Sequence, residues 1–135
     1  MANALYDLGR EAFLDGSISW SSDTIKVALV DTGVYTANLA TDQYYSSLSG
    51  ATVGTDQTLA SKTVTSGVAD AADVSFTGLS SAPSIEAVVI YKDTGVAATS
   101  PLIAYIDTAT NLPVSAGATQ VDVVWDSGSN KIFKL

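Results

Sequence analysis

The sequence predicts a mainly β protein: a single-domain β-sandwich or barrel of about seven to eight strands with a short N-terminal helix. Short alternating apolar runs recur at roughly ten-residue spacing, which is typical of such folds. The loops between them are rich in Gly, Ser and Thr, and small and β-branched residues dominate the apolar composition. A chain of 135 residues fits one domain, so we expect 1–135 to form a single β-rich unit.

Segment 1–16 is predicted to be helical. Its apolar residues recur at three- and four-residue spacing, as on one face of a helix: Leu5, Leu8, Ala12 and Phe13. Asn3 can cap this helix, and the pair Asp15 and Gly16 is a stop signal. The apolar face either packs on the protein's own sheet, which is the commoner arrangement, or docks on a neighbouring subunit.

The alternating runs predict strands at 17–20, 24–31, 59–66, 74–77, 85–91, 102–107, 121–125 and 131–135. Residues 85–91 are the most apolar run and are predicted to be a central strand buried on both faces. Segment 38–48 is ambiguous and could contain a short helix that begins at Thr41. Residues 50–54 are expected to form a turn, and 67–72 a connection of small residues.

The charge balance argues against two classes of partner. Six basic and 14 acidic residues give a net charge of −8, which repels nucleic-acid phosphates and anionic membrane surfaces. No apolar run approaches the ~20 residues that span a bilayer, and the first residues do not resemble a secretory signal. We therefore expect a protein that is made in the cytoplasm and binds neither nucleic acid nor membrane.

The residue types also argue against catalysis. Without histidine or cysteine, the chain cannot form a Ser-His-Asp triad or a cysteine nucleophile. The paired aspartates are interpreted as turn and strand-edge residues: Asp70 with Asp73, and Asp122 with Asp126. Segment 126–130 has alternating oxygen donors but lacks most ligands of a calcium loop, so a hairpin turn is preferred. We expect no enzyme activity and no catalytic, cofactor-binding or metal-binding residues.

Self-association is expected instead. The apolar side chains are mostly small, so they fill a core thinly, and burial shared between subunits would add stability. The N-terminal segment is the candidate contact. We predict that Tyr6, Arg10 and Phe13 lie in or near it, unless the helix completes the monomer's own core.

Several runs of the sequence resemble a family of small structural proteins of tailed bacteriophages. The similarity covers nearly the whole chain and is carried by MANALYDLGREAFLDG (1–16), IKVALVD (25–31), VADAADV (68–74), IYKDTG (90–95), IAYID (103–107) and the closing segment 125–133. These runs are interpreted as fold-determining strands and turns, and none marks a functional residue.

The resemblance, together with the composition, implies a virion protein that decorates and cements the capsid. Its expected partners are the major capsid protein and copies of itself, in a homotrimer seated on the capsid surface. Assembly would take place in the host cytoplasm. Two other functions stay open: a tail tube, tip or fibre-associated structural protein, and a carbohydrate- or calcium-binding surface module.

Overall fold

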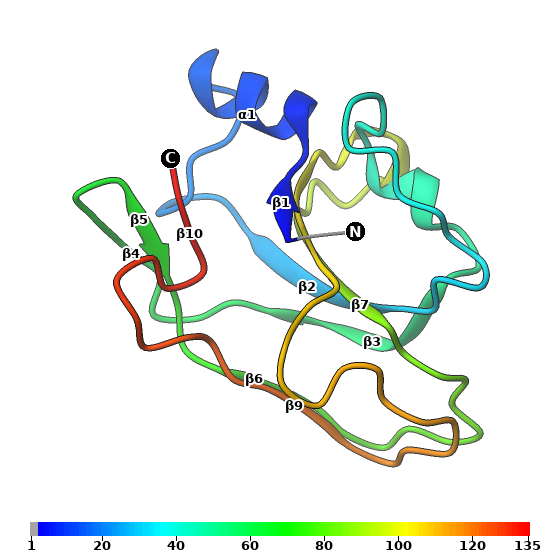
Figure 1. Ribbon diagram of the computed structural model, residues 1–135. Helices are drawn as coiled ribbons and strands as arrows, with labels where there is room; N and C mark the ends of the chain where they lie inside the picture. Colours follow the sequence, from blue (N-terminus) through cyan, green and yellow to red (C-terminus); the bar gives the residue numbers. More distant parts are fainter. Residues whose placement is uncertain (1–2) are drawn as a thin grey trace.

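A five-stranded antiparallel sheet forms the centre of the computed structural model, which describes residues 3–135 (Figure 1). The strands lie side by side in this order: β1 (Ala4–Leu5), β8 (Leu102–Ile106), β7 (Ala87–Lys92), β2 (Ile25–Val30) and β3 (Thr52–Thr58). Together with one short N-terminal helix and two smaller antiparallel sheets, it confirms the predicted mainly β class.

The central strands β7 and β2 are paired over six residues, from Ile25 opposite Lys92 to Val30 opposite Ala87. Five of the six β7 residues are buried, which confirms 85–91 as the central buried strand. Alternate side chains enter different cores: Val88 and Ile90 point to one face, and Val89 points to the other. Both faces of the sheet must therefore be covered.

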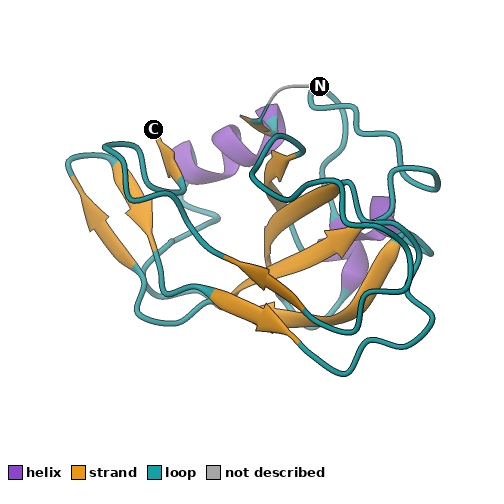
Figure 2. Ribbon diagram, turned by 60° about the horizontal axis from the view of Figure 1, so that its bottom comes forward, coloured by secondary structure: helices purple, strands orange, loops and turns teal. Residues whose placement is uncertain are grey.

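Two small sheets cover the first face. One contains β10 (Phe133–Lys134), β5 (Val68–Asp70) and β4 (Thr63–Thr65), and the other contains β6 (Val74–Phe76) and β9 (Val121–Val123). Figure 2 shows this second layer below and beside the central sheet. Buried Trp20 and Phe76 fill the space between the layers. The arrangement is that of a small β-sandwich.

The irregular segment 31–51 covers the second face. It contributes the buried residues Tyr35, Ala37, Leu48 and Ala51 and contains a short 3-10 helix, η1 (Tyr45–Leu48). A second 3-10 helix, η2 (Ala97–Thr99), lies between β7 and β8 and contacts η1. Segment 38–48 does contain a short helical turn, as the sequence allowed, but it begins at Tyr45 and Thr41 does not cap it.

The N-terminal helix α1 (Asp7–Leu14) is shorter than segment 1–16 suggests. Leu5 belongs to β1, because its backbone pairs with β8. The prediction of Asn3 as the helix cap was wrong: Tyr6 occupies that position and makes no side-chain cap. The Asn3 side chain instead accepts hydrogen bonds from the backbone N–H groups of Asp107 and Thr108 at 2.9 Å each.

Several predicted strands are shorter in the structure, such as 59–66, where only Thr63–Thr65 forms a strand, and three other segments differ in kind. Segment 17–20 is not a strand, because its backbone bonds locally, as where Ser19 N–H donates to the Asp23 carboxylate. The predicted turn 50–54 lies partly in β3, where Gly54 has a φ of +74° beside a break in register with β2. The predicted connection 67–72 contains β5, which gains partners from β4 and β10.

Gly9 sets how closely α1 approaches the sheet. A Cβ atom at this position would lie 2.5 Å from the carbonyl oxygen of Leu102 and 3.2 Å from the Cα of Ile103. Both contacts are with backbone, which cannot move aside as a flexible side chain would. Glycine is therefore required here for the helix to rest on β8.

We predict that Gly9→Ala destabilises the protein by roughly 1–3 kcal/mol, the usual cost of overpacking. Helix propensity alone predicts the opposite, a gain of up to about 1 kcal/mol. Urea denaturation measures the difference. The matched control is Glu11→Ala at an exposed position of the same helix, which should change stability by less than about 0.5 kcal/mol. A Gly9→Ala variant as stable as wild type would contradict the close helix–sheet contact.

Candidate functional site

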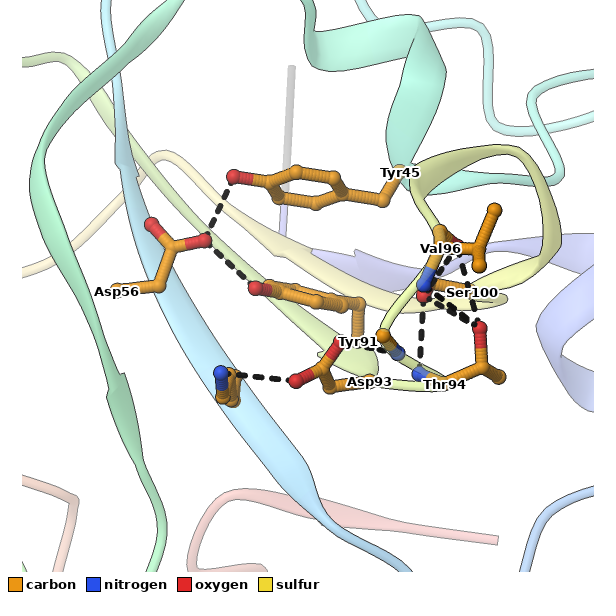
Figure 3. A network of polar contacts seen from close by, with 9 residues as sticks. Tyr45, Asp56, Tyr91, Asp93, Thr94, Val96 and Ser100 are labelled. Carbon is orange, nitrogen blue, oxygen red and sulfur yellow. Dashed lines mark hydrogen bonds and ion pairs between the residues drawn. The ribbon is translucent and has the colours of Figure 1, made fainter.

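The strongest polar cluster lies beneath segment 31–51, where one carboxylate joins two tyrosines. The Tyr45 and Tyr91 hydroxyls each donate a hydrogen bond of 2.6 Å to Oδ2 of Asp56. Their rings are tilted by 31° to one another, with centroids 4.3 Å apart (Figure 3). Tyr45 comes from η1, Tyr91 from β7 and Asp56 from β3, so the cluster ties the covering segment to two strands of the sheet.

A second cluster of the same kind lies in the same core. The Tyr35 hydroxyl donates to Oδ2 of Asp42 at 2.6 Å and is hydrogen-bonded to the Tyr6 hydroxyl at 2.9 Å. The same Asp42 oxygen accepts the backbone N–H of Asn38 at 2.9 Å. Five of the six tyrosines thus belong to the core under segment 31–51, all except Tyr44.

Burial keeps these tyrosines protonated. Burial, together with the hydrogen bond to the Asp56 carboxylate, raises the pKa of Tyr45 to about 12. Burial likewise raises the pKa of Tyr6, Tyr35 and Tyr91 well above the usual range. A neutral hydroxyl that already donates to a carboxylate is a structural donor rather than an activated nucleophile.

A cleft of about 360 Å³ lies beside Glu86, Tyr105 and Asp107. Oε1 of Glu86 accepts the backbone N–H of Thr32 at 2.9 Å and the Thr32 hydroxyl at 3.0 Å. Burial opposes ionisation of Glu86, but hydrogen bonds from Ser84 and Thr32 outweigh it and lower its pKa. Glu86 is therefore an ionised acceptor that anchors a loop and lacks the raised pKa of a general acid.

The predicted turn and strand-edge aspartates differ in their partners: Asp122 accepts a local hydrogen bond from the Gln120 side chain at 2.9 Å, whereas Asp73 bonds to a residue far along the chain. Asp73 accepts the backbone N–H of Trp125 at 2.9 Å, and segment 126–130 forms a turn in which Lys131 N–H donates to the Gly128 carbonyl. Within residues 3–135, no group of three or more acidic side chains is placed to hold a metal ion.

The second candidate is a surface, which we call the helix–hairpin end: α1, the β4–β5 hairpin and β10. The Phe13 and Phe133 ring centroids lie 5.9 Å apart, and the Trp20 ring meets Phe133 edge-on at 5.2 Å. These contacts join the helix to the C-terminal strand, and Figure 1 shows the C-terminus beside α1 and the hairpin projecting next to it.

The helix–hairpin end exposes apolar side chains. Leu14 is 88% exposed, Leu135 59% and Val64 56%. In the described part of the chain, β4 pairs only with β5, so its outer edge has no neighbouring strand. Exposed apolar side chains beside an open strand edge are features of a surface that contacts another protein.

The three predicted contact residues have different surroundings. Tyr6 is fully buried in the chain's own core, so its side chain offers no surface to a partner. Arg10 is exposed and bonds to Oδ1 of Asp7 at 2.7 Å, and Phe13 is half-buried against Phe133. The sequence analysis did not single out Leu14 as a contact residue. Leu14 lies outside the apolar face of the helix and directly before Asp15, where the helix was predicted to end, and this position is the one sign that it would be exposed.

A scan of protein-family models gives no match to this sequence, and neither does a search of curated proteins. Among residues 3–135, no helix has the length and apolar character needed to cross a bilayer. The features of the chain that bear on its function are therefore the helix–hairpin end and the two tyrosine clusters.

We predict that Tyr45→Phe lowers the free energy of unfolding by about 1.5 kcal/mol, the lower end of the range for hydrogen bonds to charged groups. Asp56 keeps Tyr91 as a donor but loses one of its two hydroxyl partners. Chemical denaturation at neutral pH measures the loss. The matched control is Tyr44→Phe, the neighbouring tyrosine outside the cluster, and equal losses in both variants would contradict the role of Asp56.

Alkaline pH should destabilise the fold. Tyr45 has a raised pKa, so above about pH 10 the unfolded chain loses its phenolic proton while the folded chain retains it. The stabilisation is complete below pH 10 and is lost as pH rises through about 12. Denaturation midpoints measured across this range should fall steadily, and less steeply in Tyr45→Phe. A flat profile would show that the phenols are not protected by the fold.

Proposed function

We propose that this chain is a non-enzymatic structural protein of a tailed-phage particle, which decorates the outer shell and stabilises it. The observation that carries the proposal is the helix–hairpin end, with exposed Leu14, Val64 and Leu135 on a tightly built β-scaffold. Its partners are the major capsid protein and copies of itself. The family resemblance of the sequence supports the assignment to a virion.

Covering this end would stabilise an assembly. Removing apolar surface from water contributes about 25 cal/mol per Å². The surface projects from the fold on a helix and a hairpin, and a projecting surface suits contact with another protein better than enclosure of a small ligand. Repeated contacts of this kind are what a cementing protein needs.

The internal use of polar groups supports a structural role over a catalytic one. Asp42 and Asp56 hold tyrosine hydroxyls, and Glu86 holds the backbone of Thr32. Each of these carboxylates holds a residue of segment 31–51, which covers the second face of the central sheet. A net charge of −8 suits a position on the outside of the shell, away from packaged DNA.

The decisive experiment compares phage particles with and without the protein. We expect particles that lack it to release DNA at lower temperature or after milder osmotic shock, as followed with a DNA-binding dye. Adding the purified protein back should restore resistance, whereas an equal amount of an unrelated acidic protein should not. Copy number should follow the number of shell subunits. Particles that are fully robust but fail to adsorb to cells would replace this proposal with a tail function.

A further inference from the structure

We propose that the cleft beside Tyr105 binds a guanidinium group, the planar cation carried by an arginine side chain or by a small free compound. The cleft measures about 360 Å³, and none of its lining residues belongs to the helix–hairpin end. This site goes beyond the proposed function, which assigns the cleft no role.

The cleft lies at one end of the central sheet. Glu86 directly precedes β7, while Tyr105 and Asp107 lie at the end of β8. Because β7 and β8 are antiparallel, these three residues come together at the same end. Residues of segment 31–51 and of the loop after β8 complete the lining, among them Thr32, Thr36 and Pro113.

The Tyr105 hydroxyl is the observation that points to a ligand. Tyr105 is only 4% exposed, and a buried hydroxyl normally has a hydrogen-bond partner. The hydroxyls of the other four core tyrosines are all bonded within the chain: Tyr6, Tyr35, Tyr45 and Tyr91. Among residues 3–135, the Tyr105 hydroxyl has no such bond. Since every fully enclosed side-chain oxygen in this part of the chain has a partner, this hydroxyl must be open to the cleft.

The cleft is negatively charged. Glu86 and Asp107 line it, and none of the described lining residues is basic. The two lysines of the β2–β7 pair, Lys26 and Lys92, lie at the opposite end of the sheet. Burial and the nearby carboxylates of Asp107 and Glu86 raise the pKa of Tyr105, so its hydroxyl is neutral. Such a site repels anions and attracts a cation that carries hydrogen-bond donors.

The kind of acceptor selects guanidinium among cations. This group has five N–H donors in one plane and is more weakly hydrated than ammonium, so it suits a half-enclosed site with acceptors from several segments. Oε1 of Glu86 already accepts two hydrogen bonds from Thr32, but a carboxylate has about four acceptor positions. The Tyr105 hydroxyl is a second acceptor. Asp107, which accepts the Thr108 hydroxyl at 3.2 Å, contributes charge.

A sugar fits this cleft less well. Tyr105 is the only aromatic residue of the lining, and its ring packs in the core against Tyr6 and Tyr35, with ring centroids 6.5 Å apart in each pair. The ring therefore offers no free face on which a sugar could stack.

Titration of isotope-labelled full-length protein with ethylguanidinium chloride, followed by NMR, tests the proposal. The backbone amide signals of Thr32, Glu86 and Asp107 should shift and saturate, with a dissociation constant on the order of 1 mM. Sodium chloride at equal ionic strength should not reproduce these shifts. Propylammonium should bind about fivefold more weakly, because it lacks the planar set of donors.

Tyr105→Phe separates ligand binding from a structural role. The hydroxyl has no partner in the chain, so the variant should be at least as stable as wild type, while its dissociation constant rises about fivefold. The matched control, Tyr45→Phe, removes a bonded hydroxyl outside the cleft and should lose stability but bind like wild type. Glu86→Gln should raise the dissociation constant about tenfold or more, whereas Asp122→Asn on β9 should leave it unchanged.

Four results would overturn the inference: no saturating shift, shifts that sodium chloride reproduces, a Tyr105→Phe variant that binds like wild type, or one that loses as much stability as Tyr45→Phe. Shifts caused by calcium chloride but not by ethylguanidinium would assign the cleft to a metal ion instead. An end-blocked tripeptide with a central arginine distinguishes the two sources. If it binds at least as tightly as ethylguanidinium, the cleft accepts a protein side chain, and if it does not bind, the ligand is a small free compound. These measurements need no phage shell, so their failure would leave the proposed function standing.

Discussion

The pairing of β2 with β7 is the constraint on which the rest of this structure depends. Six residues of each strand are in unbroken register, and their side chains are buried on both faces of the sheet. A two-faced apolar sheet cannot be left in water, so the remaining chain must supply two covering layers. The small sheets provide one, and segment 31–51 provides the other.

Segment 31–51 has few regular hydrogen bonds of its own, which explains the tyrosine clusters. An irregular segment over a core must satisfy its polar groups through side chains. Asp42 and Asp56 do this by accepting hydrogen bonds from tyrosine hydroxyls. The tyrosine rings lie in the apolar core, and their hydroxyls reach its boundary. These carboxylates and hydroxyls are of the kind that can serve in catalysis, but here they hold segment 31–51 against the sheet.

The polar groups that hold the covering segment are used inside the protein. Asp42, Asp56 and Glu86 are engaged in hydrogen bonds within the chain, which leaves the exposed residues and the cleft beside Tyr105 as the candidates for contact with other molecules. Leu14, Val64 and Leu135 are exposed on the elements of the helix–hairpin end, where α1 and β10 pack together through Phe13 and Phe133. Gly9 allows α1 to lie directly against the backbone of β8, so the helix at this end is supported by the sheet.

The sequence by itself determined the β class, the central strand at 85–91 and an N-terminal helix, because alternation and helical spacing are local patterns that neighbouring residues reveal. Only the tertiary structure decided that Leu5, Gly54 and Ala69 belong to strands, since β1 pairs with β8, β3 with β2 and β5 with β10, which are all distant in sequence. It also decided that Tyr6 is buried while Leu14 is exposed. Both lie at the ends of one helix, and its orientation is set by packing against β8, which is distant in the sequence.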